Sequence, residues 1–180
     1  MLFRPHAWDP KKETEDIQEI AAIFCEGIRK KHSHQLGFFP EKTYILAVKR
    51  GRIRIAEMII QFDSPFGKQG ATIQTGFVFF GLRKPEARIY QICLNPEWRG
   101  KGLGREMVEE VQREATKSGC AIVTLRCRGD LQANDFWDHL GYENYKTEDT
   151  KNTRKSPIRS WMKEVVFHPQ KTGQTVQKKS

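Results

Sequence analysis

Long hydrophobic runs are missing from this sequence. No apolar stretch approaches the roughly 20 residues of a transmembrane helix, and the opening residues, Met-Leu-Phe-Arg-Pro-His, do not form a secretory signal. The chain has only 4 cysteines, and no two of them have the Cys-x-x-Cys spacing of zinc or redox sites. We therefore expect a cytoplasmic protein without a metal site or a membrane partner, and we expect reduced, packed cysteines at Cys25, Cys93, Cys120 and Cys127.

Internal repeats and a second periodic block are also absent. A chain of 180 residues can bury one sizeable core, so we predict a single domain over residues 1–168. Residues 169–180 form a basic, polar tail that we expect to be disordered.

The most informative segment is an apolar strand that runs into a glycine-rich loop. Residues 89–94 read Ile-Tyr-Gln-Ile-Cys-Leu, and residues 99–104 read Arg-Gly-Lys-Gly-Leu-Gly before a helical pattern starts. Such a loop presents free backbone N–H groups at the positive end of a helix dipole, which favours phosphate oxygens. The segment therefore predicts a phosphorylated cofactor.

Two common phosphate-binding motifs are excluded by spacing. A nucleotide P-loop needs Gly-Lys followed by Ser or Thr, and neither Gly67-Lys68 nor Gly100-Lys101 has such a hydroxyl after it. The dinucleotide motif Gly-x-Gly-x-x-Gly fails as well, because Arg105 stands where its third glycine would fall. The motif that remains is Arg99-x-x-Gly102-x-Gly104.

The residues after the loop have a clear periodicity. Leu103, Met107, Val108, Val111 and Ala115 recur on one helical face, and Gly119 marks the end of that helix. A β-branched run over residues 121–125 then predicts a buried strand parallel to the strand before the loop. A second helix is predicted up to Gly141, with one face formed by Ala133, Phe136, Trp137 and Leu140.

These two motifs resemble those of the GCN5-related N-acetyltransferase (GNAT) family. The family's loop signature is Gln/Arg-x-x-Gly-x-Gly/Ala, and its second pattern, Asn-x-x-Ala-x-x-x-Tyr-x-x-x-Gly-Phe, aligns without a gap with Asp130 to Tyr142. The resemblance implies a single α/β domain with a mixed, splayed β-sheet flanked by helices. It also implies acetyl-coenzyme A as cofactor. For the loop alone, a glycine-rich surface turn in another α/β protein is the alternative interpretation.

The upstream sequence supplies the amino-terminal half of such a domain. Apolar residues at helical spacing predict a helix over residues 17–28. Residues 44–49 and 53–62 are predicted as two strands joined by a turn at Arg50-Gly51, and residues 64–70 as a loop. Residues 72–82 are an additional apolar segment, which we expect to lengthen the sheet. The alternative is that this segment shapes the acceptor site.

The family resemblance also implies which residues bind the cofactor. The backbone of Ile92, Cys93 and Leu94 would contact the pantetheine arm and the developing oxyanion. The pyrophosphate would be bound by the loop, with added charge from two basic side chains; the residues are Arg99, Gly100, Lys101, Gly102, Leu103, Gly104 and Arg105. Asp130 replaces the family's usual asparagine, so Asn134, one turn later, is a candidate for that cofactor contact.

The catalytic residues are less defined by the sequence. An amine with a pKa near 10.4 must lose a proton before it attacks, yet the strand before the loop offers Arg88, Tyr90 and Gln91 where the family often has a carboxylate. Glu57 is the best remaining carboxylate, and Tyr90 is second. The alternative, which the sequence favours, is that Glu57 is a solvated strand residue. Trp137 replaces the tyrosine that protonates the leaving thiolate; it could hydrogen-bond the sulfur or pack against the cofactor or the core.

The charge distribution suits an anionic partner. The net charge is +9, and residues 147–180 contain eight Lys/Arg against three Asp/Glu. A basic loop is predicted over residues 151–159, followed by a strand over residues 161–167. This surface favours coenzyme A or nucleic acid, although no nucleic-acid motif accompanies it and basic tails are often only solubilising.

We therefore predict a transferase that moves an acetyl group from acetyl-coenzyme A to an amine. The acceptor is left open between a small amine, a protein amino group and an aminoacyl-RNA, and a homodimer is left open as well. The alternative function is a non-catalytic acyl-coenzyme A-binding module, which Trp137 and the missing strand carboxylate favour.

Overall fold

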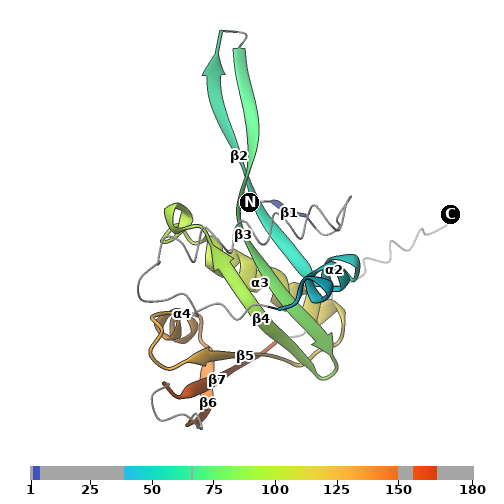
Figure 1. Cartoon of the computed structure of the whole chain (residues 1–180), viewed down its shortest axis with the longest axis vertical. Helices are drawn as coiled ribbons and strands as arrows, with labels where there is room; N and C mark the ends of the chain where they lie inside the picture. Colours follow the sequence, from blue (N-terminus) through green and yellow to red (C-terminus); the bar gives the residue numbers. More distant parts are fainter. Residues whose placement is uncertain (1, 5–38, 66, 150–155, 166–180) are drawn as a thin grey trace, which may run out of the picture.

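The described residues form one mixed β-sheet with helices on both faces. The computed structural model describes residues 2–4, 39–65, 67–149 and 156–165. In this part of the chain the strands follow the order β1-β2-β3-β4-β5-β7-β6 (Figure 1). The elements are β1 (Leu2–Arg4), α2 (Glu41–Lys49), β2 (Ile53–Ser64), β3 (Gly67–Arg83), β4 (Glu86–Leu94), η1 (Pro96–Trp98), α3 (Leu103–Lys117), β5 (Ile122–Arg128), α4 (Ala133–His139), β6 (Glu143–Glu148) and β7 (Ile158–Glu164).

Only the pair β4–β5 is parallel within the described ranges; the other neighbouring strands are antiparallel. This is the mixed α/β architecture that the sequence predicted. None of the helices in these ranges has the length and apolar character that a bilayer crossing requires.

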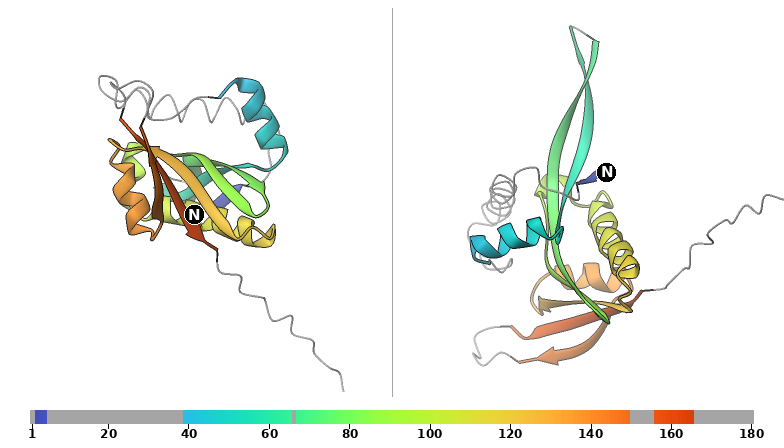
Figure 2. Two further views of the ribbon diagram at one scale, coloured as in Figure 1. Left: turned by 90° about the horizontal axis from the view of Figure 1, so that it is seen from below. Right: turned by 90° about the vertical axis from the view of Figure 1, so that its right-hand side faces the viewer.

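Two apolar clusters hold the helices against opposite faces of the sheet. On one face, α2 packs with β2, β3 and the end of β4, through residues such as Tyr44, Ile55 and Phe77. On the other face, α3 and α4 pack against the sheet in a larger cluster that includes Met107 and Trp137. Figure 2 shows α2 on one side of the strands and α3 on the other. Each face of the sheet therefore has its own apolar cluster.

The helix and strand predicted after the loop are confirmed. α3 buries the five predicted apolar residues, and Gly119 follows it with a φ of 69°, a left-handed conformation that suits glycine. β5 pairs in parallel with β4 as expected. In α4 the predicted face is partly wrong, because Ala133 is exposed and Asn134 is buried in its place.

The predicted strand over residues 44–49 is wrong, because this segment is helix α2. Tyr44, Ala47 and Val48 are its buried residues, at the i, i+3, i+4 spacing of one helical face. A short, continuous apolar run does not reveal its period, so helix and strand were not separable there. With this strand removed, the additional segment becomes β3, a central strand paired with both β2 and β4.

Three further expectations need correction. Residues 67–70 belong to β3 rather than to a loop, so β2 and β3 form one long hairpin. The last strand, β7, covers Ile158–Glu164 instead of residues 161–167. Strand β1 was not predicted at all. The predicted helix over residues 17–28, Cys25, residues 151–155 of the basic loop and the tail lie outside the described residues.

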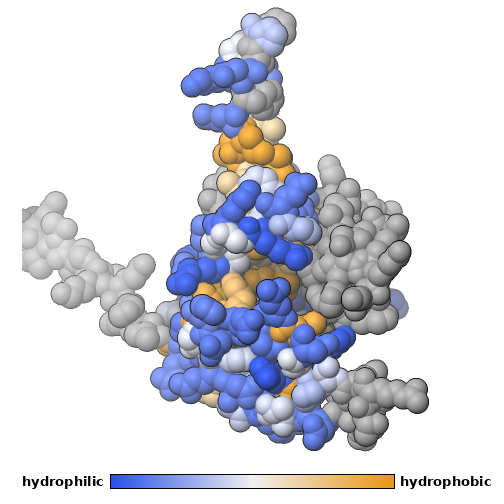
Figure 3. Space-filling view, turned by 90° about the vertical axis from the view of Figure 1, so that its left-hand side faces the viewer, coloured by the Kyte–Doolittle hydropathy of each residue, from blue (hydrophilic) through white to orange (hydrophobic). Residues whose placement is uncertain are grey.

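The β2–β3 hairpin extends beyond the sheet as a two-stranded ribbon (Figure 1). β1 pairs with β2 only as far as Glu57, and β4 pairs with β3 only as far as Gly76. Where the ribbon leaves the body, Ile59 is 56% exposed and Ile73 is 36% exposed. Figure 3 shows this apolar band at the base of the projection.

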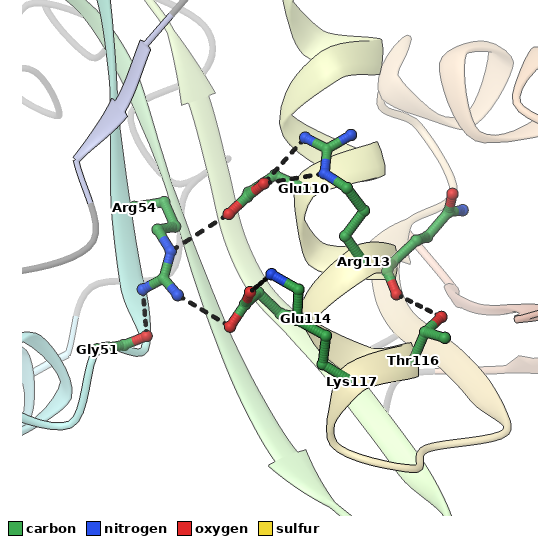
Figure 4. Close-up of polar contacts among 8 residues, drawn as sticks. Gly51, Arg54, Glu110, Arg113, Glu114, Thr116 and Lys117 are labelled. Carbon is green, nitrogen blue, oxygen red and sulfur yellow. Dashed lines mark hydrogen bonds and ion pairs between the residues drawn. The ribbon is translucent and has the colours of Figure 1, made fainter. Parts of the chain in front are cut away.

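A buried arginine ties β2 to α3. Arg54 is 6% exposed and lies between two glutamates of α3, 3.5 Å from Glu110 and 3.1 Å from Glu114. Its guanidinium also donates to the carbonyl of Gly51 (Figure 4). It lies 5.6 Å from the ring centre of Phe80. Because a charge in the core is costly unless it is paired, these contacts make the position of α3 against the sheet specific.

The ionised form of Glu114 is favoured by this arrangement. Partial burial would raise the pKa of the Glu114 carboxyl, but the hydrogen bond from Lys117 and the charges of Arg54, Lys117 and Arg52 lower it below the ordinary value of 4.5. A depressed pKa means that the folded state holds the carboxylate more strongly than the unfolded chain does. The resulting stability is present above about pH 4.5 and is lost as the pH falls through the lowered pKa.

We predict that Arg54→Met lowers the free energy of unfolding by about 1–3 kcal/mol at pH 7, because it leaves two partly buried carboxylates without their shared cation. Arg113→Met is the matched control: Arg113 also contacts Glu110, at 2.9 Å, but its side chain is 52% exposed. We expect the control to change stability by at most about 0.5–1 kcal/mol. Urea unfolding at pH 7 and at pH 4 measures both effects, and equal losses for the two variants would contradict the prediction.

Candidate functional site

β4 and β5 part along their length. Their parallel pairing runs from Glu86 with Ile122 to Ile89 with Leu125 and stops there. Both strands nevertheless continue, β4 to Leu94 and β5 to Arg128. The sheet is therefore open between the carboxyl ends of two parallel strands, which is where open α/β sheets bind ligands.

A β-bulge lies at the point where the strands part. On β3, Phe79 pairs with Gln91 and Phe80 pairs with Ile89, so Tyr90 is the extra residue of β4. A bulge bends its strand and increases the local twist. This geometry explains why β4 leaves β5 immediately after Ile89.

The bulge also changes which side chains face each layer. Before it, Ala87 and Ile89 belong to the cluster with α3. After it, Cys93 belongs to the cluster with α2, while Ile92 and Leu94 pack on the α3 side. Tyr90 and Gln91 consequently both lie on the α2 face, although neighbouring strand residues normally alternate.

The glycine-rich loop lies at the end of β4 and opens α3. Gly102 is the N-cap of α3 with a φ of 82°, and Gly100 has a φ of 72°. A Cβ atom at either position would meet nothing within 4 Å, so the glycines serve the backbone conformation and not close packing. Within the described ranges, the backbone amides of residues 100–104 donate to no backbone acceptor. The loop therefore offers a set of N–H groups at the positive end of a helix.

Basic side chains surround the loop. Arg99, Lys101 and Arg105 are exposed, whereas Glu106 is the acidic residue in the first turn of α3. Nε and Nη2 of Arg99 each lie 3.3 Å from the carbonyl oxygen of Leu94, and the Lys101 ammonium lies 4.6 Å from the ring centre of Trp98. These residues provide the charge that an anionic ligand would require.

The base of the loop is tightly packed. Leu103 is 6% exposed, and a Cβ atom on Gly104 would lie 3.2 Å from the ring of Phe136 and 3.5 Å from the Leu94 side chain. The first turn of α3 is thus held against α4 and the end of β4. This packing fixes the direction in which the free amides point.

Asn134 and Trp137 lie in the protein core. The side-chain amide of Asn134 donates to the carbonyls of Arg128 and Leu131, at 2.7 Å each, and its oxygen accepts a hydrogen bond from the Trp161 indole at 3.1 Å. Trp137 is 3% exposed and packs edge-on against Phe136 and Tyr142. These contacts support a packing role for both residues.

Asp130, which replaces the family's usual asparagine, is engaged by Arg128. The guanidinium forms two contacts with the carboxylate, at 3.1 and 2.6 Å, and the hydrogen bond lowers the pKa of Asp130 below its ordinary value. The Cys127 thiol nearby is buried, and burial raises its pKa to about 11. Cys93, Cys120 and Cys127 are all buried, as expected for packing residues.

Of the two candidate bases, only Tyr90 lies where β4 and β5 part. Glu57 pairs with Gln74, two strands from β4 and beyond the last pairing of β3 with β4. Strand geometry puts Glu57 roughly 15–20 Å from Tyr90. The structure therefore places Tyr90 where β4 and β5 part, whereas Glu57 lies two strands away from β4, level with the end of that strand.

A buried polar pair next to the bulge was missed from the sequence. The Tyr44 hydroxyl of α2 donates to the side-chain oxygen of Gln91 at 2.9 Å, and both residues are at most 3% exposed. The polar Gln91 within the apolar run of residues 89–94 was the available signal. Its partner was hidden, because the apolar run of residues 44–49 predicted a strand. No group of three metal-ligating side chains occurs in the part of the chain that the structure describes.

Comparisons with known proteins agree with this geometry. Residues 17–142 match the family model described as Acetyltransferase (GNAT) family. The chain is 33% identical over 57 residues to GCN5-related N-acetyltransferase 2, chloroplastic, of Arabidopsis thaliana. That match covers 32% of this chain and only 21% of the plant protein.

Solved structures share the fold at low sequence identity. Ard1 from Thermoplasma volcanium has a TM-score of 0.65 and 16% identity, with 92% of this chain and 97% of that chain covered. The structure of YncA from Salmonella typhimurium with its cofactor acetyl-CoA has a TM-score of 0.61 and 14% identity, with 93% and 95% covered. The family model spans more than half of the sequence, and the fold agrees with it. The chain belongs to the acetyltransferase (GNAT) family.

Proposed function

We propose that this protein transfers an acetyl group from acetyl-coenzyme A to an amine. The observation that carries the proposal is the combination of two features at one end of the sheet. β4 and β5 part after Ile89, and the amides of residues 100–104 lie at the helix end that follows β4. The opening between the two strands fits the extended pantetheine arm of the cofactor, and the amides at the helix end fit its diphosphate.

Different residues of the site bind different parts of acetyl-coenzyme A. The amides of residues 100–104 bind the diphosphate, and Lys101 and Arg105 add charge. The backbone of Ile92, Cys93 and Leu94 binds the pantetheine arm and polarises the thioester carbonyl. Acetyl-coenzyme A supplies the activated acetyl group. Because backbone atoms do most of the binding, the conformation of the loop matters more than its side chains.

We predict that Gly102→Asp abolishes acetyl-coenzyme A binding, because it places a carboxylate and a Cβ atom where the diphosphate binds and strains a left-handed residue. Gly67→Asp is the matched control. Gly67 has a φ of 101°, an added Cβ there also meets nothing within 4 Å, and it lies at the far end of the β2–β3 ribbon. Calorimetric titration should show no binding to Gly102→Asp and unchanged affinity for Gly67→Asp. Unchanged affinity of Gly102→Asp would refute the assignment of the loop.

Acetyl transfer requires the acceptor to arrive as a neutral amine. Its nitrogen attacks the thioester carbonyl, a C–N bond forms, the C–S bond breaks and the amine gives up a proton. Tyr90 is the candidate to relay that proton: its oxygen accepts the amine proton while its own hydroxyl proton passes to water. It lies at the bulge with 47% of its surface exposed. The departing thiolate has a parent pKa near 8.5 and can leave without a dedicated acid, which is compatible with a core position for Trp137.

We predict that Tyr90→Phe lowers kcat by about 10²-fold, the usual scale for losing a proton-transfer group, while the affinity for acetyl-coenzyme A stays the same. Glu57→Gln serves as the comparison and should leave kcat within about twofold. Strand geometry puts Glu57 roughly 15–20 Å from Tyr90, which lies where the strands part. Steady-state thiol release measures both variants. The opposite ranking would assign the proton transfer to Glu57.

The transfer itself is tested by incubating the protein with acetyl-coenzyme A and a thiol-detecting dye across pools of small amines, peptides and aminoacyl-RNA. We expect thiol release that depends on one of these pools. Binding of acetyl-coenzyme A without release from any pool would favour the non-catalytic module instead. Release that requires aminoacyl-RNA would make nucleic acid the partner of the basic surface.

Two further expectations belong to this proposal. We infer a cytoplasmic location, which is supported by the free, buried thiols of Cys120 and Cys127, since reduced cysteines are typical of reducing compartments. We also infer that residues 1–168 form one domain, followed by the basic tail.

A further inference from the structure

A cavity lies on the α2 face of the sheet, next to the bulge. Its volume is about 570 Å³, and it is bounded by α2 and the turn after it, by the last residues of β3 and by the first half of β4. Pockets of roughly 300–1,000 Å³ hold small ligands. Tyr90 is both the bulge residue and part of the cavity wall, so the cavity begins where β4 and β5 part.

Positive charge is concentrated around this cavity. Among the described residues that line it, four are arginines and one is acidic; they are Arg50, Arg52, Arg83, Arg88 and Glu86. Glu86 is committed to Arg88, at 2.9 Å, and also accepts a hydrogen bond from Thr124. Arg50 and Arg83 are exposed and pair with no carboxylate in the described part of the chain. The cavity is therefore an anion-binding environment.

The position of Tyr90 connects this charge to the proposed reaction. A Cβ atom on Gly81 would lie 2.8 Å from the Tyr90 hydroxyl oxygen, so the tyrosine ring lies over the bare backbone of Gly81. Gly81 pairs across the sheet with Arg88. The Tyr90 hydroxyl thus projects from the bulge toward the arginines, and its ring packs 5.0 Å from the ring of Phe79.

Electrostatics then selects the acceptor. A simple amine is a cation at neutral pH, and the excess of arginine over acidic side chains in the cavity wall repels it. An amine that also carries a carboxylate or a phosphate gains charge-assisted hydrogen bonds from the guanidinium groups. The same positive field favours the neutral form of the bound amine, which assists its deprotonation.

We propose that the cavity binds the acceptor, and that the acceptor is a small amine whose nitrogen lies a few bonds from a carboxylate or phosphate group. This inference rests on the proposed acetyl transfer. Arg50 and Arg83 bind the anionic group, and the amine nitrogen lies near Tyr90 and the thioester. The carboxylate and the phosphate share this chemistry, and the choice between them is made by the experiment.

The test compares matched acceptors and matched variants. O-phosphoethanolamine is compared with ethanolamine, and 4-aminobutyrate with butylamine, in the thiol-release assay at saturating acetyl-coenzyme A. Each acceptor is measured with the wild-type protein, with the double variant Arg50→Gln/Arg83→Gln, and with Arg113→Gln/Arg126→Gln. The last variant removes the same charge from exposed arginines outside the cavity.

We expect kcat/KM to be about tenfold or more higher for at least one acceptor with an anionic group than for the matched amine that lacks it, which is the scale of a charge-assisted hydrogen bond. Arg50→Gln/Arg83→Gln should remove this preference through a higher KM, and Arg113→Gln/Arg126→Gln should keep it. Equal use of the amines that lack an anionic group, a preference that survives in the cavity variant, or turnover only of acidic peptide N-termini would each overturn the proposal.

Failure of the proposed function is distinguishable from failure of this inference. If the wild-type protein binds no acetyl-coenzyme A by calorimetry, the acetyl-transfer assignment is wrong. Titration of O-phosphoethanolamine and 4-aminobutyrate without cofactor then still tests whether the cavity binds amines with an anionic group. Saturable binding that is lost in Arg50→Gln/Arg83→Gln supports it, and absence of binding contradicts it.

Discussion

The extra residue of β4 is the constraint on which the geometry of the site depends. With Tyr90 in the strand, β4 keeps its antiparallel pairing with β3 but cannot follow β5 beyond Ile89. One inserted residue therefore opens the sheet, turns Gln91 and Cys93 toward α2, and places a tyrosine at the point of divergence. The loop at the end of β4 could bind a diphosphate without this bulge, but the opening between the strands would be closed.

The positive charges of this protein occur in two different environments. Arg54 is buried and is neutralised by two glutamates of α3, so it contributes to the packing of the fold. Three of the cavity arginines, Arg50, Arg83 and Arg88, and the basic residues of the loop are exposed and have fewer acidic partners. The first arrangement holds α3 in place, and α3 in turn orients the amides of the loop. The exposed basic residues of the cavity and the loop are available to anionic ligands.

Local signals made part of this structure predictable. The spacing from Leu103 to Ala115 and the left-handed glycines depend on residues close in sequence, and the loop, α3 and β5 were found on these grounds. Segment 44–49 failed because five consecutive apolar residues have no readable period. The burial of Asn134 could not be foreseen either, since its partner Trp161 is 27 residues away in the chain.

The parting of the strands and the cavity depend on contacts that no single segment encodes. The bulge exists only in the register between β3 and β4, and the cavity is assembled from three separate stretches of sequence. Neighbouring residues along one strand say nothing about the strand beside it. The resemblance to a family supplied the expectation of a splayed sheet, but the position of the split and the basic wall of the cavity became visible only in three dimensions.

The connections between strands bear on the order in which the sheet assembles. β2 and β3 are joined by a short turn, so their ladder can zip from the tip inward at little cost in loop entropy. β4 and β5 are parallel, and all of α3 must cross over before they meet. We expect the antiparallel hairpin to form early and the parallel pair late, so that the catalytic opening is completed only when the rest of the chain is in place.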